Sequence, residues 1–357
     1  MHRSTWLGST AGAASVAVLM ALSACAKTAD DPQPASTDAG QQVQSTGGTG
    51  DSCTAAKYNG GVPTLDLTTI TVGFAQSEKE ANPFRITETE SIKAEAAERG
   101  IKLITTNAQS DLNKEIADIQ SMIAQGAKAL IISPLNSEGL DPALKAAQDA
   151  KVPIMTIDRL LTSKTACTNY IGWIGSDFVM QGQRAADALM TATAGKGEVV
   201  ILLGASGVNV TVDRTKGFKD RLAAKKSALT VVAEQTADFT REKGRTVTEQ
   251  LISANPGITA IYAENDEMAL GAVAALKAAG KKPGDVKIIT IDGTKGAVQG
   301  IVDGWIAGVI ESNPRFGPLA FQALDDFYSG KGVPAKTIIA DKEYTVQNAT
   351  AELRNAY

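Results

Sequence analysis

The sequence contains almost no histidine: His2 is the only one among 357 residues. His2 lies in an N-terminal stretch that has the features of an export signal, so we expect the mature protein to contain no histidine at all. Without an imidazole, a protein cannot use Ser-His-Asp or Cys-His catalysis, and it lacks a common nitrogen ligand of zinc. The sequence therefore disfavours these enzyme classes, and we expect no metal and no cofactor.

The sequence also lacks an excess of positive charge. It has 35 Lys and Arg residues against 39 Asp and Glu residues, and removing residues 1–24 takes away Arg3 alone, which leaves 34 against 39, a net charge of −5. No basic tract, heptad pattern or membrane-length apolar run follows the N-terminal segment. A mildly acidic chain lacks the excess of basic residues that binds the phosphate groups of nucleic acid. We therefore expect no nucleic-acid partner.

The N-terminal segment has the composition of a signal peptide. Arg3 gives a positive start, residues 11–22 form a short apolar core, and residues 22–25 read Leu-Ser-Ala-Cys. The core is too short to span a bilayer permanently. Its ending resembles the bacterial lipobox, so we expect cleavage after residue 24 and lipidation of Cys25; the alternative is an ordinary cleaved signal with an incidental cysteine. The protein would then be exported and held at the outer face of the cytoplasmic membrane only by its lipid.

Residues 25–66 are expected to form the lipidated end and a flexible tether, because they are rich in small and polar residues and poor in large apolar ones. With Cys25 assigned to the lipid, Cys53 and Cys167 are the only possible disulfide pair. Disulfides persist in exported proteins. We predict that these two cysteines are joined; two free thiols are the alternative.

Two apolar segments far apart in the chain share a pattern. Residues 154–158 read IMTID, and residues 288–292 read IITID. Continuous β-branched runs suit strands that are buried on both faces of a parallel sheet. Ligands of open parallel sheets bind outside the carboxyl ends of the strands. We therefore expect Asp158 and Asp292 to face a shared cleft, one from each half of the mature chain.

Strands and helices alternate through the remaining residues, which number about 290 and therefore predict two domains. The predicted strands cover residues 69–75, 102–106, 129–133, 152–158, 198–203, 229–234, 259–263, 287–291, 306–310 and 337–345. The predicted helices cover residues 85–98, 112–123, 140–150, 178–193, 213–225, 241–254, 267–279, 295–303 and 316–329. This alternation predicts an α/β fold of parallel sheets with helices on both faces.

Polar side chains follow most of the predicted strands. Carboxylates, guanidinium groups and amides form directional hydrogen bonds, and a neutral polyol, whose hydroxyls both donate and accept, matches such a mixture. Phenylalanine rings could pack on the C–H face of a sugar ring. Taken singly, each polar residue also has a structural interpretation as a helix cap or a salt-bridge partner. The predicted ligand-binding residues are Gln76, Asn82, Phe84, Arg85, Asp158, Arg159, Asp213, Arg214, Phe239, Asn265, Asp292 and Glu311.

These residues belong to motifs that resemble the ribose/galactofuranose branch of the type I periplasmic binding proteins, the solute receptors of bacterial ABC importers. In family order, the motifs are residues 82–84 (NPF), 157–159 (IDR), 213–214 (DR) with 217–218 (GF), 237–239 (ADF), 264–272 (ENDEMALGA) and 291–294 (IDGT). The aromatic-Arg pair at residues 84–85, the run at residues 238–241 and Glu311 resemble galactofuranose-type receptors more closely than ribose receptors.

The resemblance implies two doubly wound parallel-sheet domains that are joined by three hinge strands and bind one monosaccharide between them. It places one lobe at residues 67–175 and 312–340, and the other at residues 176–311 and 341–357. It also implies an ABC permease as the partner, a monomeric receptor and no enzymatic activity.

Two other functions are compatible with the same features. A receptor that reports its ligand state to a membrane sensor kinase or chemoreceptor would have the same fold and pocket. A glycosidase could use Asp158 and Asp292 as a carboxylate pair, but Arg and Asn partners would keep both carboxylates ionised and leave no general acid. A transcription regulator of this fold would need a DNA-binding module where this chain has a signal and a tether.

Overall fold

The computed structural model describes residues 35–36, 42–46 and 52–357. Its first lobe is built on an eight-stranded sheet in the order β1-β2-β13-β7-β6-β5-β3-β4. The strands from β13 to β4 are parallel, and β2 and β1 extend the edge through antiparallel pairings. The strands are β1 (Ala35–Ser36), β2 (Gln42–Thr46), β3 (Thr71–Gln76), β4 (Lys102–Asn107), β5 (Ala127–Ser133), β6 (Ile154–Ile157), β7 (Gly172–Ser176) and β13 (Lys336–Ile339).

The second lobe is built on a six-stranded sheet in the order β14-β12-β11-β10-β8-β9. All neighbours are parallel except β14, which pairs with β12 in the antiparallel direction. The strands are β8 (Lys196–Leu203), β9 (Ala228–Thr236), β10 (Ala260–Ala263), β11 (Lys287–Asp292), β12 (Gly308–Glu311) and β14 (Glu343–Thr345).

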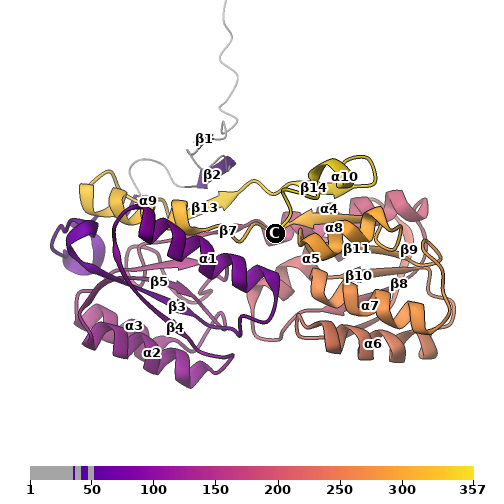
Figure 1. Cartoon of the computed structure of the whole chain (residues 1–357), viewed down its shortest axis with the longest axis horizontal. Helices are drawn as coiled ribbons and strands as arrows, with labels where there is room; N and C mark the ends of the chain where they lie inside the picture. Colours follow the sequence, from indigo (N-terminus) through magenta and orange to yellow (C-terminus); the bar gives the residue numbers. More distant parts are fainter. Residues whose placement is uncertain (1–34, 37–41, 47–51) are drawn as a thin grey trace, which may run out of the picture. The chain divides into compact units, whose positions relative to one another are not determined.

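Helices cover both faces of the first sheet (Figure 1). On one face, α1 (Pro83–Glu98) and α9 (Gly317–Ser329) pack against Ala129 and Ile131 of β5. On the other face, α2 (Leu112–Ala124) and α3 (Asp141–Asp149) pack against Leu130 and Ile132. Because successive side chains of a strand point to opposite faces, a continuous apolar run buries both faces at once.

The second sheet is covered in the same way. On one face, α4 (Phe178–Thr193) and α5 (Asn209–Ala224) pack against Val199 and Ile201 of β8. On the other, α6 (Arg241–Ala254), α7 (Asp266–Ala278) and α8 (Lys295–Val302) pack against Val200 and Leu202. A short helix, α10 (Ala349–Glu352), follows β14. The predicted fold of two parallel sheets with helices on both faces is confirmed.

The chain passes from one sheet to the other three times. It crosses between β7 and α4 at residues 176–178, between β12 and α9 at residues 311–317, and between β13 and β14 at residues 339–343. We call these three segments the hinge. Because all three lie outside the sheets and helices or at their ends, they are the places where a change in the angle between the lobes can be absorbed.

Two strand predictions differ from the structure. Strand β7 was not expected from the residue pattern, because two of its five residues are glycine, which weakens the signal of a strand. The predicted last strand at 337–345 is two strands, β13 and β14, which belong to different sheets. The three residues between them form the third crossing of the hinge.

The expected tether at residues 25–66 is packed in part. Val43 of β2 is buried, and β2 pairs with β13. Tyr58, in a short 3-10 helix (Tyr58–Gly60), is fully buried, and its hydroxyl donates to the carbonyl of Asn169 at 3.3 Å. A second 3-10 helix (Leu67–Thr69) leads into β3. In the described part of this segment, buried apolar residues such as Val43 and Tyr58 pack against the first lobe. The expected signal peptide and Cys25 lie outside the described residues.

The predicted disulfide between Cys53 and Cys167 is confirmed. Cys53 forms a β-bridge with Val333, and Cys167 lies in the connection between β6 and β7. The bond therefore fastens the N-terminal segment to the first lobe.

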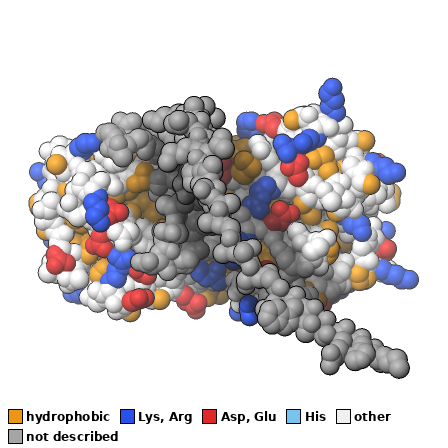
Figure 2. All heavy atoms as spheres, turned by 90° about the horizontal axis from the view of Figure 1, so that it is seen from above, with side chains coloured by type: hydrophobic (Ala, Val, Ile, Leu, Met, Phe, Trp, Pro, Cys, Tyr) orange, Lys and Arg blue, Asp and Glu red, His pale blue; other side chains and the backbone are white. Residues whose placement is uncertain are grey.

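Charged side chains of both signs are interspersed on the face seen in Figure 2, where no large area carries a single sign. Within the described ranges, no group of three or more His, Cys, Asp or Glu residues is placed to hold a metal ion. None of the helices in these ranges is both long enough and apolar enough to cross a membrane.

Candidate functional site

Asp158 and Asp292 occupy equivalent positions at the carboxyl ends of β6 and β11. Both have positive φ angles, 59° for Asp158 and 143° for Asp292. Such angles cost energy for any residue with a Cβ, and they are found most often where a site requires them. Both side chains line one pocket.

Eleven residues from the two lobes line this pocket. The first lobe contributes Glu78, Asn82, Phe84, Arg85, Asp158 and Arg159, and the second contributes Val210, Arg214, Phe239, Asn265 and Asp292. Nine of the twelve predicted residues are therefore brought together. The cavity is only about 40 Å³, room for a few water molecules. A larger ligand can enter only if the lobes separate or the lining side chains move.

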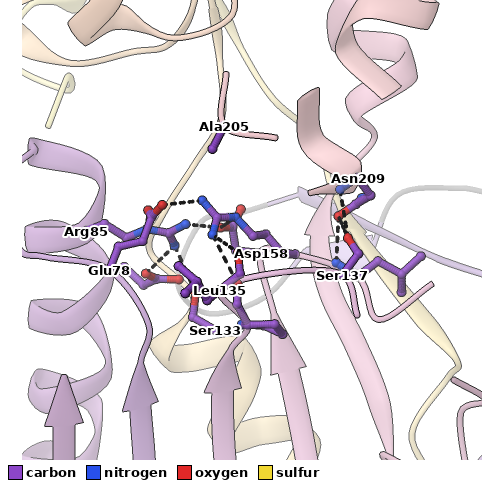
Figure 3. Close-up of polar contacts among 12 residues, drawn as sticks. Glu78, Arg85, Ser133, Leu135, Ser137, Asp158, Ala205 and Asn209 are labelled. Atoms are coloured by element: carbon purple, nitrogen blue, oxygen red, sulfur yellow. Dashed lines mark hydrogen bonds and ion pairs between the residues drawn. The ribbon is translucent and has the colours of Figure 1, made fainter. Parts of the chain in front are cut away.

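Arg85 organises the first-lobe side of the pocket (Figure 3). Its Nη2 is 2.7 Å from Asp158 Oδ2, and its Nη1 donates to Glu88 Oε2 at 2.8 Å and to Ser133 Oγ at 3.0 Å. Its Nε is 2.7 Å from Glu78 Oε2. Hydrogen bonds on several sides fix the plane of the guanidinium group.

Glu78 joins the two arginines of this side. Its Oε1 accepts from Arg159 Nη2 at 2.7 Å while its Oε2 accepts from Arg85. Burial raises the pKa of Glu78, but the guanidinium groups of Arg159 and Arg85 outweigh it and lower the pKa to about 2. Glu78 was not among the predicted residues. Its signal was its place just after β3, two residues beyond Gln76, which was predicted instead.

Arg159 and Asp158 each also take part in a hydrogen bond between a side chain and a backbone carbonyl. Arg159 Nη1 donates to the carbonyl of Leu135, and the indole N–H of Trp173 donates to the Asp158 carbonyl at 2.9 Å. The buried Nε of Arg159 has no hydrogen-bond partner within the described part of the chain. It lies 4.0 Å from Asp158 Oδ2, which is longer than a hydrogen bond.

Gln76 does not line the pocket but lies behind it. Its Nε2 donates to Glu88 Oε2 at 2.7 Å and to Thr89 Oγ1 at 3.3 Å, so it supports Arg85 through Glu88. Burial raises the pKa of Glu88, and Arg85 opposes this rise.

Arg214 organises the second-lobe side. Its Nη1 donates to the Glu264 carbonyl at 2.6 Å and its Nε donates to Gln181 Oε1 at 2.9 Å. Its guanidinium carbon lies 5.5 Å from the centre of the Phe178 ring. Its Nη2 is 3.7 Å from Asp292 Oδ1, a looser contact than the Arg85–Asp158 pair. Arg214 therefore holds its position largely without Asp292.

The pKa of Asp292 is shifted in the direction opposite to the one expected, in which arginine keeps both pocket carboxylates ionised. Burial raises the pKa of Asp292 well above its usual range, the distant Arg214 opposes the rise only in part, and nearby Asp266 adds to it. Asp266 is itself buried behind the pocket, where its Oδ2 accepts from the backbone N–H groups of Gly293 and Thr294. A carboxylate at Asp266 raises the pKa of Asp292 because two like charges repel each other in a buried site.

Two further predicted residues lie outside the pocket. Asp213 lines a separate groove of about 760 Å³, together with Asp177 and Lys336, and accepts from Asn209 Nδ2 at 3.2 Å. Glu311 lies in the hinge, where its carboxylate accepts from the hydroxyl of Tyr344 at 3.1 Å and from the backbone N–H of Lys342 at 3.0 Å. A polar residue that follows a strand therefore does not always line the pocket.

Asn82 and Asn265 have capping roles in addition to lining the pocket. Each begins a helix and accepts from a backbone N–H three residues on, Arg85 for Asn82 and Met268 for Asn265, both at 3.0 Å. The Nδ2 of Asn265 also donates to the Phe239 carbonyl at 3.2 Å. Asn82 and Asn265 therefore each cap a helix and line the pocket.

Apolar side chains form the remaining walls. The Phe84 ring packs edge-on against Phe316 and Tyr357, with centroids 6.4 and 6.3 Å away. Phe239 and Val210 face the pocket from the second lobe, and Val210 was not predicted. The pocket therefore combines charged groups with aromatic surfaces.

Hydrogen bonds also join the lobes beside the pocket (Figure 3). The backbone N–H of Asn209 donates to Ser137 Oγ at 2.8 Å, and Asn209 Oδ1 accepts from the backbone N–H of Leu160 at 3.0 Å. Ser137 N–H donates to the Gly207 carbonyl at 3.1 Å. These contacts hold the two rims of the pocket together.

The family comparisons agree with this geometry. The periplasmic binding protein domain matches residues 72–332. The chain is 38% identical over 280 residues to the ribose import binding protein of Bacillus subtilis (strain 168), covering 78% of this chain and 88% of that protein. It is 35% identical over 290 residues to the galactofuranose-binding protein of Escherichia coli (strain K12), covering 80% and 90%.

Solved structures give the same assignment. A galactofuranose-binding protein superposes with a TM-score of 0.77 at 33% identity, covering 80% of this chain and 98% of that one. A Mycobacterium smegmatis protein in complex with β-D-fucofuranose gives a TM-score of 0.76 at 34% identity, covering 80% and 95%. The chain therefore belongs to the periplasmic binding protein family.

Proposed function

We propose that this protein is an extracytoplasmic receptor that captures one monosaccharide between its lobes and delivers it to an ABC importer. The observation that carries the proposal is the pocket itself, in which two opposed sets of arginine and carboxylate groups face each other from different lobes. A small ligand can bond to both sets only when the lobes close on it, so binding and closure are one coupled event.

The charge balance of the pocket favours a neutral ligand. Three guanidinium groups and three carboxyl groups line it, and one of these carboxyls, Asp292, has a raised pKa. An ionic ligand would add a further charge to this buried site, whereas a neutral one would not. A sugar hydroxyl can donate to a carboxylate and accept from a guanidinium group at the same time. The rings of Phe84 and Phe239 supply surfaces for the C–H groups of the sugar.

We propose that the ligand is an aldose. The first candidate is galactofuranose or a similar furanose, and the second is ribose. The relatives named for ribose and galactofuranose and the structure with bound β-D-fucofuranose support this class. The Arg85 guanidinium is an additional charged donor, which suits a sugar with more hydroxyls than a pentose. We further propose that the mature receptor is monomeric and anchored through a lipid on Cys25, which lies outside the described residues.

A thermal-shift screen of pentoses, hexoses and furanose-forming sugars on the mature protein tests the proposal. A sugar present at 100 times its Kd should stabilise the protein by about 2.7 kcal/mol. Calorimetry on each hit should give one site per chain. Turnover of glycosides, or the absence of any stabilising sugar, would contradict the proposal.

Membrane fractionation tests the anchor separately. Cys25→Ala should release the protein from membranes, while its sugar affinity stays unchanged because the pocket is far along the chain from residue 25. Unchanged membrane attachment of this variant would contradict lipidation.

A further inference from the structure

Gln181 connects the pocket with the hinge. It lies on α4, immediately after the first crossing, and only 1% of it is exposed. Its Oε1 accepts from Arg214 Nε at 2.9 Å, and its Nε2 donates to Asp341 Oδ2 at 2.8 Å and to the Glu311 carbonyl at 3.2 Å. One buried amide thus contacts the pocket arginine, the second crossing and the third crossing.

The orientation of this amide is fixed by its neighbours. Arg214 can only donate, so it requires the amide oxygen, whereas the Glu311 carbonyl can only accept and requires the amide nitrogen. Rotating the amide by 180° would set donor against donor and acceptor against acceptor. A glutamine with one permitted orientation holds the groups on its two sides in a fixed relation.

Asp341 extends the contact to the whole hinge. Its Oδ1 accepts from Ser176 Oγ of the first crossing at 3.1 Å and from the backbone N–H of Asn313 in the second crossing at 3.3 Å. Asp341 itself belongs to the third crossing. Because rotation of the lobes changes the relation between these three segments, this set of hydrogen bonds depends on the angle between the lobes.

We propose that Gln181 is a positioning residue that couples sugar binding at Arg214 to closure of the hinge. Arg214 reaches Asp292 and the pocket with one end of its guanidinium group and Gln181 with the other. A sugar that fixes Arg214 therefore favours the arrangement of Gln181 and Asp341 that belongs to the closed lobes. This inference rests on the proposed sugar-binding function, because it takes Arg214 as a ligand contact.

Gln181→Glu tests the role of the amide nitrogen separately from that of the amide oxygen. The glutamate keeps an oxygen for Arg214 but removes the donor to Asp341 and the Glu311 carbonyl and places a carboxylate next to them. We expect the sugar affinity to fall at least about tenfold and the compaction at saturating sugar, measured by small-angle X-ray scattering, to be incomplete. If the glutamate variant does not fold, Gln181→Met replaces it in the test. Methionine removes both the oxygen and the nitrogen of the amide without adding charge, and we expect the same loss of coupling.

Gln183→Glu is the matched control, because Gln183 lies on the same helix and makes no side-chain hydrogen bond to the pocket or hinge within the described chain. It should bind and compact as the wild type does. Full compaction of both Gln181 variants with affinity within twofold of wild type would overturn the inference. If the wild type and Gln183→Glu bind no sugar, the proposed function fails as well, so the two failures are distinguishable.

Discussion

At the scale of single residues, the partly buried Glu78 and the fully buried Glu264 have opposite pKa shifts. Glu78 lies between the guanidinium groups of Arg85 and Arg159, which lower its pKa to about 2 even though burial raises it. Burial raises the pKa of Glu264 to about 7, and the donors Thr215 and Gly204 reverse this only in part. The two residues should therefore give opposite dependences of stability on pH.

Glu78→Gln should lower stability at neutral pH. The folded-state pKa of Glu78 lies below its ordinary value of 4.5, so its contribution is present above about pH 4.5 and is lost as the pH falls toward 2. We expect the free energy of unfolding at pH 7 to fall by about 2–3 kcal/mol, measured by urea denaturation. Glu90→Gln, an exposed change on α1, is the control, and equal stability of the two variants would contradict the ion-paired role of Glu78.

Glu264→Gln should have the opposite effect. Because the folded-state pKa of Glu264 lies above 4.5, the folded protein binds the extra proton between about pH 4.5 and 7, and stability declines as the pH rises through that window. Between pH 4.5 and 8, the free energy of unfolding should therefore fall by about 3 kcal/mol less in the variant than in the wild type. Urea denaturation across this range, with the exposed Glu242→Gln as control, measures it. A decline as steep in Glu264→Gln as in wild type would exclude a raised pKa.

The position of a polar residue after a strand predicted most of the pocket but not all of it. Asp158, Arg85 and Asp292 could be found because the carboxyl ends of parallel strands converge on one edge. Gln181 could not, because it lies within a helix and its role depends on the packing of that helix beside the hinge. The pKa of Asp292 also could not be predicted, because it depends on burial and on the 3.7 Å separation from Arg214.

At the scale of elements, the apolar runs predicted the buried strands well, because burial on both faces selects β-branched residues without interruption. β7 escaped detection because Gly172 and Gly175 replace large side chains. Close neighbours explain them: a Cβ on Gly172 would lie 2.6 Å from the Pro334 carbonyl oxygen, and one on Gly175 would lie 2.3 Å from the Trp173 ring. Such contacts arise only in the tertiary structure.

The segment before β3 is an element whose order depends on tertiary contacts. The Cys53–Cys167 bond closes a loop with a sequence separation of 114 residues, and such a bond restricts the unfolded chain. Replacing both cysteines by alanine should lower the free energy of unfolding by about 2–5 kcal/mol, measured by urea denaturation under oxidising conditions. Sugar affinity should stay unchanged, because neither cysteine lines the pocket. Equal stability of the double variant and wild type would contradict a stabilising role for this bond.

At the scale of the whole molecule, the described residues hold the lobes closed around a pocket too small for a sugar. Ser137 and Asn209 bond across the rim, and the Phe84 ring of the first lobe packs on Tyr357 of the second. We therefore expect a sugar to enter an open form, and closure to replace ion pairs between pocket side chains with bonds to the sugar hydroxyls. We therefore expect the affinity for the sugar to depend on contacts from both lobes.

Calorimetric titration of Asp158→Ala and Asp292→Ala with the sugar found in the screen measures how much each lobe contributes to binding. Each change removes from one lobe a carboxyl group that can bond to the sugar, so each should weaken binding by about 2–3 kcal/mol, a 30- to 100-fold loss in affinity. Both variants should stay folded, because the two side chains face the pocket. Asp213→Ala, which alters a carboxylate outside the pocket, should bind within about threefold of wild type. Unchanged affinity in either pocket variant would contradict a receptor that closes both lobes on its sugar.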